Sequence, residues 1–416
     1  MILKRSLTVL IALIMLIFAF SACKSEGTGE KPDPEPEQVT LSVEDLDIQH
    51  ETEFGGVYIK ITIEDFNKLG FEYGDSVSVR FSNGYTLEDI PYYNGYYVDA
   101  GQPLLVAYPG YDYIKACVNY GADMWDTADL DDTESPNLLK SNALRNDMWV
   151  TAQLEPKEEG KHYTAAVYLN EHGKYLDIQQ ARDIHYYDER ERYPSDEVFA
   201  NFREITVGII KSGILYRSAS PCDNQHNRAT YVDRLIEGAN VNCILNLADN
   251  ERKIERYNSD ESFECPYFLS LYSNGKVIPV ALSMNYLSDD FAVKIADGFI
   301  KMSEMDGPYL IHCTEGKDRT GFVCMLIEAL AGASYQEIAD DYMLTYANYY
   351  EITKESEPSK YTTILEKNLD AMLITVVGDD SVDIKTADLS VYARNYLLNA
   401  GMTEEQIDTL VSRITE

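Results

Sequence analysis

A cysteine and an arginine lie six positions apart in one short segment of this 416-residue chain. The segment, residues 312–321, reads His-Cys-Thr-Glu-Gly-Lys-Asp-Arg-Thr-Gly. A cysteine thiolate is a strong nucleophile, and an arginine guanidinium can hold two oxygens of one phosphoryl group. Cys313 and Arg319 together therefore predict nucleophilic attack on a phosphate ester.

The flanking sequence predicts a strand, a tight loop and a helix. Residues 308–311 form a short apolar run, and residues 322–330 are apolar enough for a buried helix. In such a turn the loop N–H groups and the helix N-terminus converge on a point that attracts phosphate. We expect these dipoles and Arg319 to stabilise the thiolate of Cys313, and Gly316 to let the backbone turn. The expected phosphate-binding residues are Thr314, Glu315, Gly316, Lys317, Asp318, Arg319 and Thr320, the last as a donor to the sulfur.

The ten-residue string resembles the signature loop of the cysteine-dependent protein tyrosine phosphatase superfamily. It is most similar to the bacterial secreted tyrosine and dual-specificity phosphatases, some of which also accept phosphoinositides. Residues 202–205, 213–221 and 241–251 resemble the strands and the acidic loop of that family, so the likeness covers roughly residues 195–416. It implies a phosphocysteine intermediate on Cys313 and neither a metal nor a cofactor. No Trp-Pro-Asp string occurs, which leaves the general acid and the preference for tyrosine open.

Two aspartates compete for the role of general acid, which must protonate the leaving oxygen. Asp249 follows a predicted strand, where parallel α/β sheets place their sites, and it matches the acidic position of the family. Asp318 lies inside the loop, as in the myotubularin-type lipid phosphatases that it resembles. We favour Asp249. Glu251 is either a supporting residue or an exposed glutamate, and Lys317 points either toward phosphate or toward water.

Three functions fit these residues. The first is hydrolysis of phosphotyrosine in proteins, which the resemblance favours. The second is hydrolysis of inositol phosphates or phosphoinositides, favoured by Lys317 and Asp318. The third, of another class, is a phosphate-binding module without turnover, which the intact pair of Cys313 and Arg319 disfavours.

The first 38 residues predict export and anchoring. Lys4 and Arg5 precede an apolar stretch, residues 7–20, that ends in Ser-Ala-Cys. The pattern resembles a bacterial lipoprotein signal over residues 1–22, with lipidation at Cys23. About fourteen apolar residues are too few to span a bilayer, which takes roughly 20. Residues 23–38 are rich in Pro, Glu and Gly and predict a tether, so we expect a lipid-anchored protein facing outside the cytoplasm.

A formal net charge of −35 argues against nucleic acid as a partner, because the excess of carboxylates would repel backbone phosphates rather than neutralise them. It also disfavours flat docking on an anionic lipid surface, so we expect contact with the membrane through the lipid anchor alone. The expected partners are therefore a phosphorylated protein or a small phosphate ester.

Six cysteines remain after Cys23, and their spacing matches no metal site. Cys243 and Cys324 fall in apolar runs and predict core packing. Outside the cytosol, oxidation could switch off Cys313, including by pairing with Cys222 or Cys265.

Two domains are predicted after the tether. Residues 39–188 predict a small β-rich domain: residues 57–63 and 76–81 alternate at period two, and residues 64–69 form a helix that Gly70 stops. The stretch 54–121 resembles the C-terminal barrel of S-adenosylmethionine hydroxide adenosyltransferases, although Gly56 replaces their usual asparagine. Its tyrosines either pack half-buried on a sheet or form an exposed binding cluster; they are Tyr92, Tyr93, Tyr96, Tyr97, Tyr108, Tyr111 and Tyr113.

Residues 189–416 predict an α/β domain of the tyrosine phosphatase type, with a parallel-dominated sheet flanked by helices. Ser334 with Glu337, and Thr403 with Gln406, have the spacing of capping boxes that start two of its later helices.

Overall fold

The computed structural model describes residues 41–52, 54–99, 101–130, 163–259 and 264–415. The expected signal peptide, the tether and Cys23 lie outside these ranges, so lipidation and the anchored location stay predictions. Within the described ranges, no helix is both long enough and apolar enough to cross a bilayer.

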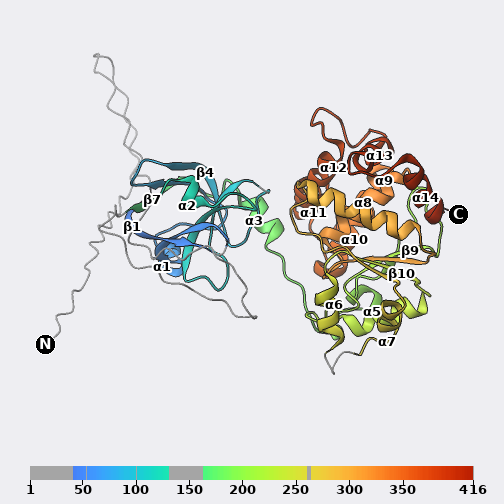
Figure 1. The fold of residues 1–416 in the computed structure, drawn as a ribbon. Helices are drawn as coiled ribbons and strands as arrows, with labels where there is room; N and C mark the ends of the chain where they lie inside the picture. Colours follow the sequence, from blue (N-terminus) through green and yellow to red (C-terminus); the bar gives the residue numbers. More distant parts are fainter. Residues whose placement is uncertain (1–40, 53, 100, 131–162, 260–263, 416) are drawn as a thin grey trace, which may run out of the picture. The chain divides into compact units, whose positions relative to one another are not determined.

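The N-terminal part is a closed barrel, in the order β1-β2-β6-β5-β4-β3-β7 (Figure 1). Its strands are β1 (Ser42–Glu51), β2 (Gly56–Thr62), β3 (Ser76–Phe81), β4 (Thr86–Tyr93), β5 (Pro103–Val106), β6 (Tyr113–Val118) and β7 (Thr164–Glu171), and its helices are α1 (Ile63–Lys68), α2 (Met124–Thr127) and α3 (Leu176–Arg182). The predicted strands and the helix before Gly70, whose φ is +109°, are confirmed. Alternate side chains such as Val77 and Val79 fill the interior.

The tyrosines of the barrel are mostly packed rather than exposed. Tyr92 and Tyr93 are fully buried, whereas Tyr108 is 44% exposed. Tyr96, Tyr97, Tyr111 and Tyr113 are half-buried. This matches the packing alternative, and the relation to the adenosyltransferase barrel stays a prediction.

The C-terminal part is an α/β fold around a five-stranded sheet in the order β11-β10-β12-β9-β8. Its strands are β8 (Arg203–Glu204), β9 (Leu215–Ser218), β10 (Cys243–Asn246), β11 (Val277–Pro279) and β12 (Tyr309–His312). Its helices are α4 (Asp196–Phe199), α5 (Ala229–Gly238), α6 (Glu251–Asn258), α7 (Pro266–Ser273), α8 (Asp289–Ser303), α9 (Asp318–Leu330), α10 (Tyr335–Tyr350), α11 (Pro358–Ile364), α12 (Asp370–Val377), α13 (Leu389–Asn399) and α14 (Glu404–Thr415), with a 3₁₀ turn, η1 (Arg190–Arg192), and a π turn, η2 (Leu365–Leu369).

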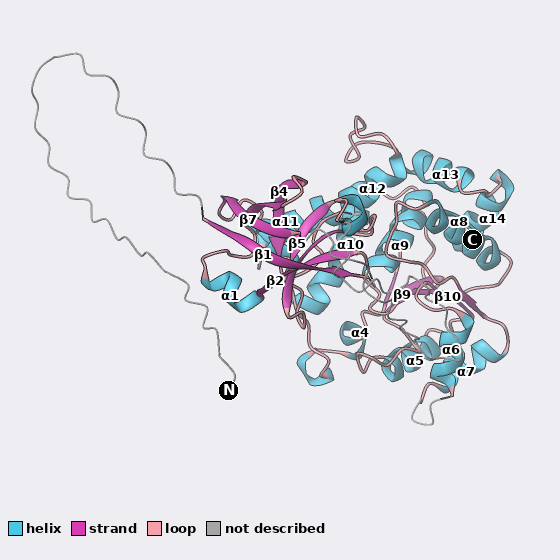
Figure 2. Cartoon of the chain, turned by 60° about the vertical axis from the view of Figure 1, so that its left-hand side comes forward, coloured by secondary structure: helices cyan, strands magenta, loops and turns pink. Residues whose placement is uncertain are grey.

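The sheet is mixed: β11, β10, β12 and β9 run parallel, and the short β8 pairs antiparallel with β9. Helices cover both faces (Figure 2), with α5 and α7 on one and α8 and α9 on the other. Successive residues of β12 point to opposite faces, so Leu310 packs with the first group while Tyr309 and Ile311 pack with the second. This double burial explains why the strand reads as a continuous apolar run.

Both predicted capping boxes are present. Ser334 and Glu337 exchange hydrogen bonds at the start of α10, and Thr403 and Gln406 do so before α14. Helix α9 begins at Asp318, four residues before the apolar run, because its first turn carries the polar residues of the loop. Cys243 and Cys324 are fully buried, as predicted.

A buried ionic network joins helix α10 to the edge strands β8 and β9 and contacts the phosphate-binding loop. Asp341 of α10 pairs with Arg203 at 2.8 Å and with Arg217 of β9 at 2.5 Å. Burial alone would raise the pKa of Asp341, but the two guanidinium groups hold that pKa well below its usual range. Its carboxylate is therefore the counter-charge of two buried cations.

Replacing Asp341 by asparagine should destabilise the fold by about 3–5 kcal/mol, because Arg203 and Arg217 would stay buried without the carboxylate that both contact. Urea unfolding followed by far-UV circular dichroism measures the loss. Asp408→Asn is the matched control: it removes a carboxylate whose side chain is 66% exposed and pairs with Arg394. The control should cost less than about 1 kcal/mol, and equal losses in the two variants would contradict the prediction.

Candidate active site

The predicted loop lies at the carboxyl end of β12, between β10 and β9, and leads into α9. Carboxyl ends of parallel strands meet at one edge of a sheet. There, the loop closes a pocket of about 250 Å³. The pocket is lined by Asp223, Gln225, Lys253, Met284, Cys313, Thr314, Glu315, Asp318 and Arg319. The structure thus brings the predicted nucleophile and the predicted arginine to one cavity.

Four successive carbonyl groups of the loop accept hydrogen bonds from surrounding residues. Nδ1 of His312 contacts the Cys313 carbonyl at 3.1 Å, and the Ser220 N–H donates to the Thr314 carbonyl. The Tyr349 hydroxyl donates to the Glu315 carbonyl at 2.8 Å.

The fourth carbonyl, that of Gly316, accepts from both Arg217 and Asn201, each at 3.1 Å. The N–H groups of residues 314–317, in contrast, donate to no residue that the structure describes. Because a carbonyl and the next N–H point in opposite directions across a peptide plane, carbonyls held by surrounding donors turn the N–H groups toward a common acceptor. The loop is therefore a prepared anion cradle.

Gly316 is required by both conformation and space. Its φ is +69°, a region that L side chains rarely adopt. A Cβ at this position would lie 2.3 Å from the carbonyl oxygen of Ser218 in β9. Any side chain there would push the loop away from the sheet, which confirms the backbone role expected for this glycine.

Two hydrogen bonds hold the guanidinium group of Arg319 in place, and its Nε has no hydrogen-bond partner among the described residues. One terminal nitrogen donates to the Leu282 carbonyl at 3.3 Å, and the other donates to Oγ1 of Thr314 at 3.2 Å. The Nε atom is also buried. A buried donor without a partner is costly, and a phosphoryl oxygen in the cradle would satisfy it.

Thr320 is fully buried, and its hydroxyl also has no hydrogen-bond partner among the described residues. A donor is thus available next to the loop, but its bond to the sulfur stays a prediction. Lys317 is half-buried between Asp318, at 3.3 Å, and Glu315, at 4.0 Å. Burial would lower the pKa of Lys317, but the neighbouring carboxylates raise it overall, so the ammonium is charged at neutral pH.

The two candidate acids lie in different surroundings. The side chain of Asp249 is fully buried; it pairs with Lys253 at 2.8 Å and accepts from Asn246 at 3.2 Å. It is not among the residues that line the pocket. Asp318 does line the pocket, and its side chain is 36% exposed. Glu251 is exposed in the first turn of α6, which matches the predicted alternative of an exposed glutamate.

All six cysteines of the described residues are free and buried, Cys222 and Cys265 included. Burial raises the pKa of Cys265 to about 12 and raises that of Cys222 well above its ordinary value. Because thiol–disulfide exchange needs a thiolate, these two are poor attacking groups at neutral pH. Their pairing with Cys313 stays a prediction.

Four pocket residues escaped the sequence analysis: Asp223, Gln225, Lys253 and Met284. Asp223 and Gln225 follow β9, Lys253 follows β10, and Met284 follows β11. Each of the four comes soon after a strand, and the carboxyl ends of these strands lie at the same edge of the sheet as the loop. The sequence shows that the residues follow strands, but it does not show the order of the strands, which was needed to place the residues together.

His312 has a pH-dependent contribution to stability. Burial lowers the pKa of His312 from 6.5 to about 4, so between these values only the unfolded chain takes up the proton. Stability is complete above pH 6.5 and falls as the pH drops toward 4. From pH 7 to pH 5, the free energy of unfolding of the wild type should fall by about 2 kcal/mol more than that of His312→Asn.

Urea unfolding at both pH values, followed by circular dichroism, measures this difference. His185→Asn is the control, because the side chain of His185 is 88% exposed, and it should follow the wild type. An unchanged pH dependence in His312→Asn would show that this imidazole is not the group responsible.

Comparison with known proteins shows which family the chain belongs to. The core catalytic domain of the PP-IP phosphatase SIW14 from S. cerevisiae, solved with citrate, is 20% identical; the match covers 43% of this chain and 90% of that chain, with a TM-score of 0.24. A second structure of the Siw14 catalytic core is 19% identical over 48% and 94%, with a TM-score of 0.26. At these values neither match bears on the substrate. No curated protein matches the sequence. The tyrosine phosphatase family model matches residues 197–416, more than half of the chain, and the chain therefore belongs to the tyrosine phosphatase family.

Proposed function

We propose that the protein hydrolyses phosphate monoesters through a phosphocysteine intermediate on Cys313. One observation carries the proposal: the loop carbonyls are held by donors outside the pocket lining, the N–H groups of residues 314–317 have no partner among the described residues, and Cys313 and Arg319 line one pocket. Such a cradle stabilises negative charge that develops on the phosphoryl oxygens. Membership of the tyrosine phosphatase family supports the same chemistry.

The reaction runs in two displacements. The Cys313 thiolate attacks phosphorus, the ester oxygen leaves, and a carboxylic acid protonates that oxygen. Water then attacks phosphorus of the phosphocysteine and gives a proton back to the carboxylate. The bond between phosphorus and sulfur breaks, which frees the Cys313 thiolate and inorganic phosphate. Arg319 and the loop N–H groups bind the phosphoryl oxygens in both steps.

We assign the acid role to Asp318 rather than to Asp249, which the sequence favoured. The support is positional: Asp318 lines the pocket with Cys313, whereas Asp249 is fully buried, is not among the lining residues and pairs with Lys253. A general acid must come within hydrogen-bond reach of the leaving oxygen. Lys253, four residues after Asp249, lines the pocket instead.

Phosphotyrosine in proteins is the proposed substrate, and two features of the pocket support it. Three carboxylates line it, those of Asp223, Glu315 and Asp318, so a leaving group with further phosphates would meet like charges. Met284, 39% exposed, offers an apolar surface to an aromatic ring. An inositol phosphate is the alternative, supported by Lys253 on the rim and by the nearby Lys317.

Loss of the nucleophile should abolish turnover and spare binding. Cys313→Ser should hydrolyse para-nitrophenyl phosphate at least about 10³-fold more slowly, while still binding inorganic phosphate in isothermal titration. Unchanged hydrolysis in Cys313→Ser would exclude the proposed mechanism. Phosphate binding by a wild type that shows no turnover of any ester would favour the module without catalysis.

The general acid can be identified by comparing how each aspartate variant hydrolyses esters with good and with poor leaving groups. Asp318→Asn should lower kcat/KM by about 10²-fold or more on a phenyl phosphate that lacks the nitro group, because its poor leaving oxygen needs a proton. The loss should be smaller on para-nitrophenyl phosphate. Asp249→Asn is the matched variant, and a steeper leaving-group dependence in Asp249→Asn than in Asp318→Asn would reverse the assignment.

The substrate class is decided by comparing kcat/KM for a phosphotyrosine peptide and for myo-inositol hexakisphosphate. We expect the peptide to be preferred by about tenfold or more. Lys253→Gln should leave the peptide value nearly unchanged. A preference for the inositol phosphate that Lys253→Gln removes would establish the alternative.

A further inference from the structure

Tyr186 reaches the phosphate-binding loop from outside the family-matched residues. Its ring packs against that of Tyr349, with centroids 5.2 Å apart, and against that of Tyr350, at 5.8 Å. The Tyr349 hydroxyl is the donor that holds the Glu315 carbonyl. Tyr186 does not itself line the catalytic pocket, but its hydroxyl is hydrogen-bonded to the side chain of Glu315, which does. Tyr186 therefore acts on the loop through Tyr349 and through Glu315.

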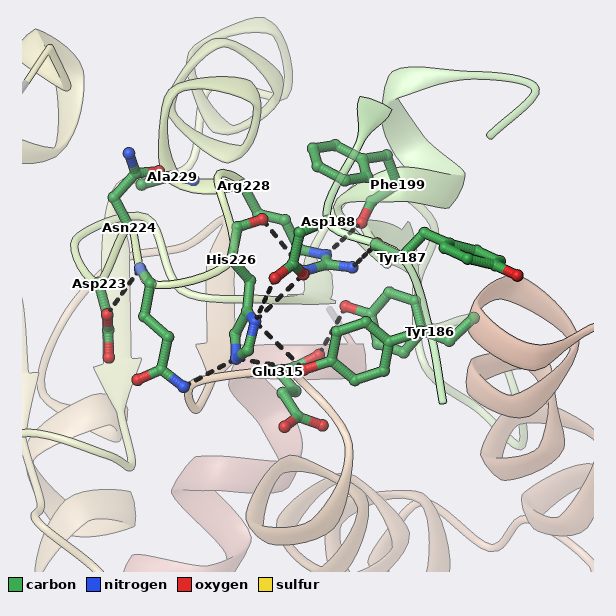
Figure 3. Close-up of polar contacts among 12 residues, drawn as sticks. Tyr186, Tyr187, Asp188, Phe199, Asp223, Asn224, His226, Arg228, Ala229 and Glu315 are labelled. Atoms are coloured by element: carbon green, nitrogen blue, oxygen red, sulfur yellow. Dashed lines mark hydrogen bonds and ion pairs between the residues drawn. The ribbon is translucent and has the colours of Figure 1, made fainter. Parts of the chain in front are cut away.

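The segment around Tyr186 is fixed to the α/β fold by a buried cation. Arg228, 2% exposed, pairs with Asp188 at 3.0 Å and donates to the carbonyls of Tyr187 and Phe199 (Figure 3). His226 also contacts Asp188, at 3.2 Å, and the Tyr186 hydroxyl, at 3.1 Å. These bonds come from the loop that follows β9, which also carries Gln225 of the pocket.

Arg228 also orders the aromatic rings. Its guanidinium carbon lies 4.7 Å from the ring centroid of Tyr186 and 4.9 Å from that of Tyr349. Tyr349 is 4% exposed, and burial raises its pKa, so its hydroxyl stays a donor at neutral pH. With Tyr186 removed, a void would open beside Tyr349, and a side chain facing a void loses packing on that side.

We propose that Tyr186 is a positioning residue for the phosphate-binding loop: its ring keeps Tyr349 where the hydroxyl fixes the Glu315 peptide. The proposal rests on the proposed function only in that the ligand of the loop is a phosphate-like oxyanion. Because binding linkage is reciprocal, an oxyanion in the loop must in turn stabilise the segment that carries Tyr186. Loop affinity and segment order are two independent readouts.

The first experiment is isothermal titration of the full chain with inorganic tungstate, which requires no turnover. Tyr186→Ala should weaken tungstate binding by about tenfold, the effect of losing one well-placed contact. It should also raise KM for para-nitrophenyl phosphate more than it lowers kcat. Tyr186→Phe keeps the ring and should restore binding to within about twofold.

Tyr187→Ala is the matched control. Tyr187 is the next residue along the chain, is 53% exposed, and its ring stacks on Arg192 rather than on the loop. It should bind tungstate as the wild type does. If circular dichroism shows that Tyr186→Ala is unfolded, Tyr186→Leu replaces it, since leucine fills most of the volume without the ring. Wild-type affinity in the folded Tyr186 variant would overturn the proposal.

The second experiment measures the reciprocal effect by limited trypsin digestion. Saturating tungstate should slow cleavage after Arg190 and Arg192, next to the segment, in the wild type and in Tyr187→Ala. It should not slow cleavage in Tyr186→Ala, and equal protection in all three would overturn the proposal. A wild type that binds tungstate but hydrolyses no ester would refute the proposed function and leave this inference standing.

Discussion

The active site depends on the outward anchoring of four carbonyl groups, those of residues 313–316. A short loop of free peptides can present either its oxygens or its N–H groups to a central point, and only the second choice attracts an anion. The donors that hold these oxygens select that choice before any ligand arrives. Preorganised dipoles of this kind need no rearrangement in the transition state, which is where their catalytic value lies.

The donors come from widely separated parts of the chain, and some of them are themselves costly to bury. Arg217 can hold the Gly316 carbonyl only because Asp341 neutralises its charge. Asn201, the second donor to that carbonyl, accepts a hydrogen bond from Arg203, which pairs with the same aspartate. Apolar side chains of similar volume could often replace such a buried ionic network without loss of stability, so the network is best explained by its support of the loop.

The proposed reaction requires the site to bind an anion although the protein is strongly acidic, with a formal net charge of −35. In the proposal the attraction is short-ranged, since it comes from the N–H groups of the loop and from Arg319, which lines the pocket. The three carboxylates that line the pocket act over the same few ångströms in the opposite sense. In the proposed function they disfavour further negative charge on the leaving group.

The sequence by itself determined the segment that carries Cys313 and Arg319, the glycine turn and the strand-loop-helix around them, because these are contiguous and each depends on local backbone geometry. It also placed two capping boxes and the barrel strands that it singled out correctly, for the same reason. Which aspartate faces the pocket was decided only by tertiary structure. Asp249 and Asp318 both follow strands in the sequence, but Asp249 is fully buried against Lys253, whereas Lys253 and Asp318 line the pocket. The donors at Ser220, Arg217, Asn201 and Tyr349 meet the loop only after the sheet is assembled, and no local pattern encodes contacts between residues so far apart in the chain.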